Sequence, residues 1–481
     1  FSVTNVPTIN AVASDNIINL SEKTAGVTLT GTAGKDDTVK IFFPDGSSTA
    51  DIITVRPSPD TGTSVWNWSY TLTDADWVKL GADTSNGVDK VIQIQSHNNI
   101  KNIDSLLVSH TVNIDTVIPV FSASTPLALA TDSGRTNSDA ITNDGTVRVS
   151  GLETGANWQY KIDSGSYQAG DTSNALVVTT QGGHTVTVRQ VDPAGNPSAE
   201  KTITFTLDTI KPDAPVLALG TGVANGATQA EVQQSSGAFT VRAEIDAYIE
   251  LVLTREDDAS KTITKPVITA NGTAQAVTLS ASDIATLGNG NILVSAKATD
   301  KAGNVSDAGT TSFVLDTLNP VVNTVTDNVT ATPDITRSPI TFEVTFSEPL
   351  SASLISSNFE AVNGTLGAIE KVSNTVYRIA VTPATGLNGA DAASDVYLKL
   401  KANGITDVAG NPLSDLDLSS KDVQRADTLA PSVASVTDNI TSDVTSGNVV
   451  FTVTFSEALN HAPAESNFSV SNGTILSGGV T

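Results

Sequence analysis

Residues 186–209 read VTVRQVDPAGNPSAEKTITFTLDT, and the fold of the chain can be worked out from this stretch. Apolar and polar residues alternate over residues 186–191 and again over residues 203–207. This period of two predicts two strands, each with one buried face. The segment between them, Asp192–Asn196, is rich in turn-forming residues. The basic pattern is therefore a strand, a turn and a second strand that ends in Asp-Thr.

The Asp-Thr pair marks the end of a repeating unit. It occurs four times with a proline three residues after the threonine, and the marks are roughly one hundred residues apart, a usual domain size. The Asp-x-Ala-Gly-Asn turn recurs as Asp192–Asn196, Asp300–Asn304 and Asp407–Asn411. We call each mark a joint and name it by its aspartate: Asp115, Asp208, Asp316 and Asp427.

Short strands at regular intervals, with Gly, Asn and Asp turns and no helical periodicity, predict an all-β fold of tandem β-sandwich domains in an extended string. We expect unit 1 at residues 5–115, unit 2 at 116–208, unit 3 at 209–316, unit 4 at 317–427 and a partial unit 5 at 428–481. Residues 1–4 read like the tail of a preceding repeat, and unit 5 repeats only the first half of unit 4. We therefore interpret the chain as a window on a longer array.

Composition limits the possible partners. The chain has 481 residues, and its 51 acidic against 26 basic side chains give a formal net charge of −25. Such a surface repels nucleic acid and anionic membranes, so we expect neither as a partner of this segment. Cysteine is absent, which excludes disulfides and thiolate metal sites. No apolar run is long enough to cross a membrane.

The strand order of a sandwich predicts where the acidic residues meet. In a seven-strand sandwich the B–C and F–G turns lie where the chain enters, beside the joint with the preceding unit. The Asp-x-Ala-Gly-Asn turn is then the F–G turn, and a glutamate follows each strand that we assign as B. Three carboxylates should therefore converge at each joint: Asp115, Glu153 and Asp192; Asp208, Glu244 and Asp300; Asp316, Glu348 and Asp407; and, in the partial unit, Asp427 and Glu457.

These acids predict a calcium site. Three like charges in one pocket repel one another unless a cation neutralises them. Carboxylates and turn carbonyls suit Ca²⁺, whereas Zn²⁺ would require His or Cys. We hypothesise that Ca²⁺ braces each unit against the preceding linker; the alternative, that each acid only forms a turn, stays open. The joint before unit 1 is degraded, because Thr4, Asp36 or Asp37, and Asn99 stand in the corresponding places. A second set of acids could approach the joints from the other side: Asp15, Asp132, Asp327 and Asp438.

Other reactive or aromatic side chains give no pattern typical of a second site. Trp158 alternates with Tyr160, and Trp66 and Trp68 share one strand face with Tyr70, so we expect them in the core rather than on a sugar-stacking platform. The histidines form no nucleophile arrangement and no metalloprotease motif, so we expect no enzyme. They are scattered along the chain: His97, His110, His184 and His461.

Several segments resemble the bacterial Ig-like repeats of giant secreted adhesins: residues 157–165 and 188–196 in unit 2, and residues 29–33 and 66–70 in unit 1. The Phe-Ser-Glu and Ser-Asn-Phe motifs of units 4 and 5 resemble the type that is also seen in S-layer proteins. The resemblance covers essentially the whole chain. It implies tandem Ig-like domains on the extracellular surface of a bacterium, within a repeats-in-toxin or biofilm-type adhesin.

The expected function is mechanical. The resemblance implies a monomeric extender whose partners are the adjacent repeats and which projects a distal binding region in cell adhesion. Cell-surface glycans or proteins would be bound through other regions of the parent. Two alternatives are a glycan- or protein-binding module, with unit 1 as the first candidate, and a scaffold of an S-layer or matrix.

Overall fold

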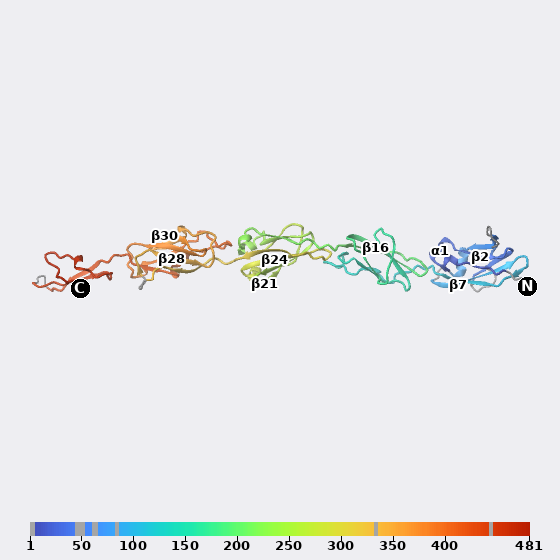
Figure 1. The fold of residues 1–481 in the computed structure, drawn as a ribbon, viewed down its shortest axis with the longest axis horizontal. Coiled ribbons are helices and arrows are strands. Elements are labelled where there is room, and N and C mark those ends of the chain that lie inside the picture. Colours follow the sequence, from blue (N-terminus) through green and yellow to red (C-terminus); the bar gives the residue numbers. More distant parts are fainter. Residues whose placement is uncertain (1–4, 44–52, 60–65, 82–85, 331–334, 442–445) are drawn as a thin grey trace.

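The computed structural model describes residues 5–43, 53–59, 66–81, 86–330, 335–441 and 446–481. The units follow one another in a single row from the N-terminus to the C-terminus (Figure 1). Strands far outnumber helices, which confirms the all-β prediction. The N-terminal tail with Thr4 lies outside the described residues. Within the described ranges, no helix has the length and apolar character needed to span a membrane.

Unit 2 is a sandwich of two sheets. The smaller sheet has the order β10 (Leu127–Leu129), β12 (Thr146–Val149), β15 (Ala175–Val177). The larger sheet has the order β11 (Ile141–Thr142), β17 (Lys201–Leu207), β16 (Gly182–Val191), β13 (Asn157–Ile162), β14 (Gln168–Ala169). The two strands read from the opening sequence are parts of β16 and β17, which pair antiparallel, so this prediction is confirmed.

Unit 3 repeats the same plan. One sheet is β18 (Val216–Leu219), β19 (Phe239–Arg242), β23 (Gln275–Val277). The other is β21 (Asp258–Thr264), β20 (Tyr248–Arg255), β24 (Gly290–Thr299), β25 (Gly309–Leu315), with β22 (Ile268–Thr269) paired to β20.

Unit 4 is also built of two sheets. The first is β26 (Val322–Thr326), β28 (Ile340–Phe346), β31 (Val376–Pro383), β30 (Gly364–Lys371). The second is β27 (Ile335–Thr336), β34 (Gln424–Ala426), β32 (Asp395–Leu400), β29 (Phe359–Val362), with β33 (Leu416–Asp417) paired to β32.

Unit 1 is also a two-sheet sandwich, and unit 5 is a single hairpin in its described part. Unit 1 contains the sheet β1 (Ile17–Ile18), β9 (Val108–Ile114), β7 (Val88–Asn98), β3 (Asp37–Phe42), β4 (Ile53–Val55), with β8 (Ile103–Asp104) on β7. Its second sheet is β2 (Thr28–Ala33), β6 (Trp66–Thr71), β5 (Ser58–Pro59). Unit 5 pairs β35 (Val433–Asp438) with β36 (Phe451–Phe455).

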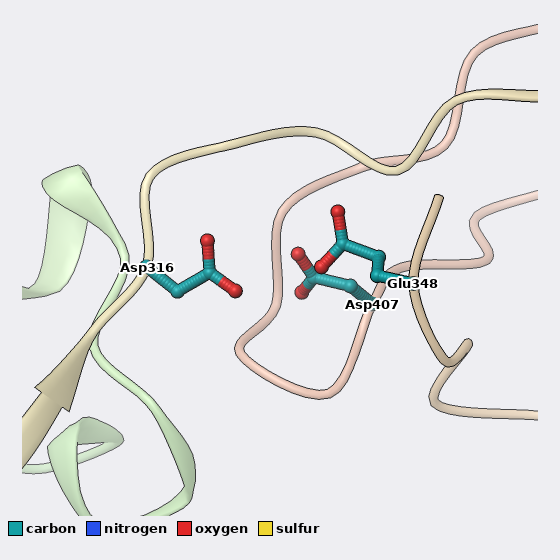
Figure 2. Close-up of side chains that lie close together, drawn as sticks. All are labelled: Asp316, Glu348 and Asp407. Atoms are coloured by element: carbon teal, nitrogen blue, oxygen red, sulfur yellow. The ribbon is translucent and has the colours of Figure 1, made fainter. Parts of the chain in front are cut away.

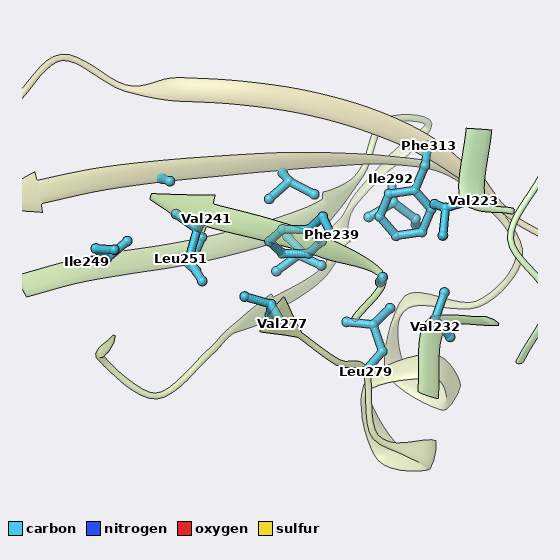
Figure 3. Close-up of a cluster of buried hydrophobic side chains, with 14 of the residues drawn as sticks. Val223, Val232, Phe239, Val241, Ile249, Leu251, Val277, Leu279, Ile292 and Phe313 are labelled. Carbon is cyan, nitrogen blue, oxygen red and sulfur yellow. The ribbon is translucent and has the colours of Figure 1, made fainter. Parts of the chain in front are cut away.

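The hydrophobic core is divided in the same way as the sequence repeats. Each of four clusters of buried side chains draws its residues from one predicted unit. Figure 3 shows the cluster of unit 3, where Phe239 and Val241 face Ile292 and Phe313 from the opposite sheet. Unit 5 has no such cluster among its described residues: Phe451 is 55% exposed.

Of the tryptophans expected in the core, Trp68 and Trp158 are buried there, as predicted. Trp68, Trp77 and Trp158 are almost completely buried. Trp66 is only partly buried. The indole of Trp158 donates to the carbonyl oxygen of Asp171 at 2.8 Å, which satisfies its one polar atom.

Four short helices were not expected from the sequence. They are α1 (Leu20–Ala25), α2 (Asp74–Leu80), α3 (Gln229–Gln233) and α4 (Ala281–Leu287). Each is preceded by a capping box, such as Ser280 with Asp283 in α4, which stabilises the first helical turn. Helices of this length show too few turns for an amphipathic period to be recognised. The short 3₁₀ segments are η1 (Val12–Ser14), η2 (Val223–Asn225), η3 (Ser356–Asn358), η4 (Ala392–Ser394), η5 (Leu418–Ser420) and η6 (Glu465–Asn467).

Candidate metal centre

Each joint begins with an aspartate that its own unit holds in place. The N–H of Asp316 donates to the carbonyl oxygen of Ala227 at 2.9 Å, and its Oδ1 accepts from the N–H of Leu318 at 3.2 Å. Thr317 donates from its N–H and its hydroxyl to Oδ1 of Asn289, at 3.2 and 3.0 Å. The Asp-Thr pair is therefore anchored to unit 3, and Oδ2 of Asp316 takes no part in these bonds.

The same anchoring recurs at the other joints. Each joint aspartate donates its N–H to a carbonyl oxygen of its own unit and accepts, through Oδ1, from the N–H two residues on. The carbonyl acceptors are Ile18 for Asp115, Thr142 for Asp208 and Thr336 for Asp427, and the Oδ1 donors are Val117, Ile210 and Leu429.

The Asp-x-Ala-Gly-Asn turn of the following unit reaches the joint through its asparagine. Asn411 donates from its N–H to Oδ1 of Asp407 at 2.8 Å and from Nδ2 to Oδ2 of Asp407 at 2.9 Å. Its Nδ2 also lies 3.0 Å from the carbonyl oxygen of Asp316, across the joint. The turn was predicted from the sequence, but the bridging role of its last residue was not. The recurrence of asparagine in all three copies was the available signal.

Three predicted carboxylates come together at the joint at Asp316. Side-chain oxygens of Asp316, Glu348 and Asp407 all lie within 4.8 Å of one another. Asp316 follows β25, Glu348 follows β28, and Asp407 lies in the turn after β32 (Figure 2). Asp407 is 1% exposed. This is the one such group of three among the described residues.

Electrostatic repulsion is evident at this group. Burial raises the pKa of Glu348 above its ordinary value, and the charges of Asp316 and Asp407 raise it further. Among the described residues, no basic side chain lowers the pKa of Glu348. A groove of ≈ 600 Å³ runs beside Asp316 and Glu348, lined also by Leu315, Leu318 and Asn319, and gives solvent and ions a path to the carboxylates.

The joint at Asp115 has the same three residue types in a looser arrangement. Asp115 and Asp192 are 7% and 6% exposed, whereas Glu153 is exposed. Burial raises the pKa of Asp115, and the charges of Asp192 and Glu153 raise it further, against the N–H of Val117. Asn196 donates from Nδ2 to the carbonyl oxygen of Asp115 at 3.0 Å. The three side chains thus share a joint without forming a close group.

At the joint at Asp208 the predicted residues are not gathered into a close group. Asn304 links Asp208 and Asp300, donating from Nδ2 to the carbonyl oxygen of the first at 2.8 Å and to Oδ2 of the second at 2.9 Å. Glu244 is exposed. Within the described residues, Asp208, Glu244 and Asp300 form no three-carboxylate group like that at Asp316.

At the joint at Asp427 a basic side chain lies between the two predicted acids. The Nη2 atom of Arg337 is 3.5 Å from Oε2 of Glu457 and 3.9 Å from Oδ2 of Asp427. It also donates to the carbonyl oxygen of Leu429 at 3.3 Å. Desolvation and the charge of Asp427 raise the pKa of Glu457, and Arg337 opposes them.

The remaining predicted acids are engaged in local bonds. Asp37 is buried and accepts from the N–H of Gly34 at 3.0 Å and from Nδ2 of Asn98 at 2.8 Å; Asn99 donates to the carbonyl oxygen of Asp36 at 2.9 Å. The second set of acids accepts main-chain N–H groups of nearby residues in the same loop: Ile17 for Asp15, Ala140 for Asp132, Val329 for Asp327 and Ile440 for Asp438.

The donor set at Asp316 fits a hard divalent cation. All of the candidate ligand atoms are oxygens, which Ca²⁺ prefers, and the site holds no His or Cys for a softer metal. Asp407 already accepts three hydrogen bonds, from Gly410 and Asn411, so Asp316 Oδ2 and Glu348 are the freer ligands.

Comparisons with known proteins identify two of the units. Residues 120–209 and residues 316–423 each match a family model described as a bacterial Ig-like domain. These stretches correspond closely to units 2 and 4 and support bacterial Ig-like repeats. The sequence matches no curated protein.

Solved structures give weaker likenesses. A structure of a 1.5-MDa bacterial ice-binding adhesin has 19% identity and a TM-score of 0.29, and the match covers 66% of this chain and 99% of that chain. Fibronectin(III)-like modules of CbhA from Clostridium thermocellum have 10% identity and a TM-score of 0.25, with 42% and 94% covered. These scores establish no common arrangement of the units.

Proposed function

We propose that the chain is a structural extender of a large bacterial cell-surface adhesin, placed outside the cell, which projects a distal binding region. The observation that carries the proposal is the way in which the units are joined. Each of the first three joint aspartates is held by its own unit through its N–H and by the next unit through an asparagine amide. A linker fixed on both sides transmits orientation from one unit to the next, which an extender needs.

The bacterial Ig-like matches support this function, because such domains are typically structural modules rather than enzymes. The row of units in Figure 1 agrees with it. The partners of each unit are then its neighbours in the same chain, and the segment acts as a monomer. The burial of Trp68 and Trp77 gives no support to the alternative of a sugar-stacking platform in unit 1.

We further propose that Ca²⁺ stiffens the array. The carboxylates of Asp316, Glu348 and Asp407 repel one another, as the raised pKa of Glu348 indicates. A bound cation would remove the repulsion and tie the linker to two loops of unit 4. Because the ligands come from both sides of the joint, ion binding would limit bending between units 3 and 4.

The test is a Ca²⁺ titration of the full chain, followed by thermal melting and small-angle X-ray scattering. We expect a higher Tm and a longer, narrower scattering profile with Ca²⁺ than with chelator. Glu348→Gln should remove most of the change, whereas Glu370→Gln, which alters an exposed glutamate in β30, should not. Identical melting and scattering with Ca²⁺ and with excess chelator would contradict calcium stiffening.

A further inference from the structure

The joint at Asp208 is crossed by a cation–π contact, and the described residues show none at the joint at Asp316. The guanidinium carbon of Arg135 lies 3.8 Å from the centroid of the Tyr248 ring. Arg135 belongs to the loop between β10 and β11 of unit 2, and Tyr248 is the first residue of β20 in unit 3. A guanidinium stacked on an aromatic face is a favourable cation–π pair, and here it spans the joint.

Further contacts cross the same joint. The hydroxyl of Ser133 donates to the carbonyl oxygen of Ala302 at 2.6 Å, and Nδ2 of Asn143 lies 3.4 Å from Oδ1 of Asn304. Gly134, with φ of +95°, is so close to unit 3 that a Cβ atom there would lie 2.0 Å from the carbonyl oxygen of Lys301. The two units thus touch backbone to backbone, and only glycine leaves room for this contact.

The corresponding loops at Asp316 make a lighter contact. Asn225 donates from Nδ2 to the carbonyl oxygen of Val408 at 3.2 Å. A Cβ on Gly226 would lie 3.0 Å from the Cβ of Ala409, a contact with a side chain rather than with a carbonyl group. No cation–π pair crosses this joint among the described residues.

The charges at the two joints also differ. The turn at Asp208 contains Lys301, whose Nζ lies 2.8 Å from Oδ2 of Asp246, and Arg135 lies nearby. In the turn at Asp316, Val408 stands where Lys301 stands in unit 3. Lys301 is compensated by Asp246, so Arg135 is the added positive charge at this joint. The joint at Asp208 is therefore a poorer place for a divalent cation, because of this charge and because its three predicted carboxylates are not gathered into a close group.

We propose that Ser133, Gly134, Arg135 and Tyr248 form a clamp that holds units 2 and 3 together without a metal ion. A divalent cation then stiffens the array at Asp316 and leaves the joint at Asp208 unchanged. The part of this inference that concerns Asp316 rests on the proposed function, and the clamp itself does not.

The experiment measures each joint separately in the full chain. The protein has no cysteine, so pairs of engineered cysteines can carry spin labels without other changes. Thr204→Cys with Thr310→Cys spans the joint at Asp208, and Ser312→Cys with Ser414→Cys spans the joint at Asp316; all four positions are exposed. Pulsed electron–electron double resonance then gives the distribution of distances between the two spin labels across each joint, in Ca²⁺ and in chelator.

We expect a narrow distribution at Asp208 under both conditions and a distribution at Asp316 that narrows only with Ca²⁺. Gly134→Ala and Arg135→Gln should each broaden the first distribution in Ca²⁺ and in chelator alike. Gly183→Ala is the matched control, because a Cβ at that glycine of unit 2 meets nothing within 4 Å.

Two results would overturn the clamp: a distribution at Asp208 that narrows when Ca²⁺ is added, or one that neither variant broadens. If the distance distribution at Asp316 did not change with Ca²⁺ while the distribution at Asp208 stayed narrow, calcium stiffening would be rejected and the clamp would stand.

Discussion

The side-chain amide of Asn411 lies 3.0 Å from the main-chain carbonyl oxygen of Asp316, so a turn of unit 4 holds the last residue of unit 3 directly. Because the same amide also donates to Asp407, one side chain fixes the turn and the linker together. The joint aspartate is therefore positioned through its backbone, and its Oδ1 is oriented by the N–H of Leu318. Asn196 and Asn304 make the equivalent bonds at Asp115 and Asp208.

We predict that Asn411→Ala loosens the joint at Asp316. Asn411 is 6% exposed, and its loss leaves the carbonyl oxygen of Asp316 without this donor, at a cost of about 1–3 kcal/mol for a buried group. Hydrogen exchange of the main-chain N–H groups of Gly410 and of the substituted residue should become faster, since the turn is no longer held. Asn374→Ala, at an exposed hairpin tip, is the control. If the protection of the turn against hydrogen exchange were unchanged, the hydrogen bonds of the Asn411 side-chain amide would not be what holds the turn.

Much of the architecture could be predicted because local sequence patterns determine it. Period-two alternation predicted β16 and β17, and the repeated Asp-Thr mark agrees with the division of the hydrophobic clusters. The meeting of Asp316, Glu348 and Asp407 followed from strand order alone, because that order determines which turns lie at which end of a sandwich.

Differences between the joints could not be predicted, because they depend on long side chains in irregular loops. Arg337 and Arg135 reach the joints from loops whose conformation no periodic pattern determines. Ala140, at the end of the loop that holds Arg135, has a positive φ of 57°, which the sequence alone would not assign to an alanine. The joints therefore share the hydrogen bonds of the joint aspartates and differ in the charged groups around them.

Stability of unit 4 without metal should fall as the pH rises. Burial and two neighbouring carboxylates raise the pKa of Glu348 in the folded state, so folding favours its protonated form. The unfolded state loses this proton near the ordinary glutamate pKa of about 4.3, and the folded state loses it at higher pH. Between these two values the free energy of unfolding decreases with increasing pH.

Melting curves in metal-free buffer over this pH range check the sign. Glu348→Gln should flatten the decrease, and Glu370→Gln should leave it as it is. Saturating Ca²⁺ should reverse the slope, because the ion binds the ionised carboxylates. A Tm that rises with pH in the absence of metal would contradict the interpretation of Glu348.

Arg337 should control the cation response of the joint at Asp427. Its guanidinium lies 3.5 Å from Glu457 and 3.9 Å from Asp427 and acts there as a built-in positive charge. In Arg337→Gln the two acids face each other unscreened, so we expect a broader distance distribution between spin labels at Ser419→Cys and Ser435→Cys. Added Ca²⁺ should narrow this distance distribution again, and more in the variant than in the parent protein.

Arg337→Lys, which keeps the charge, is the control and should broaden the distribution less than Arg337→Gln. An equal response of all three proteins to Ca²⁺ would rule out this role of Arg337.

His184 should make unit 2 more stable at mildly acidic than at alkaline pH. Its Nδ1 lies 2.9 Å from Oδ2 of Asp163 and its Nε2 lies 2.7 Å from the carbonyl oxygen of Thr180, so two acceptors face the two ring nitrogens. The hydrogen bond to Asp163 is the main cause of a raised pKa of His184 in the folded state. The stabilisation is therefore complete below the unfolded histidine pKa of about 6.5 and is lost as the pH rises through the raised folded value.

An NMR titration of the ring protons of His184 gives its folded pKa directly. Asp163→Asn, which suits the positive φ of 53° at this position, should lower this pKa. A pKa that Asp163→Asn leaves unchanged would show that the carboxylate does not hold the proton.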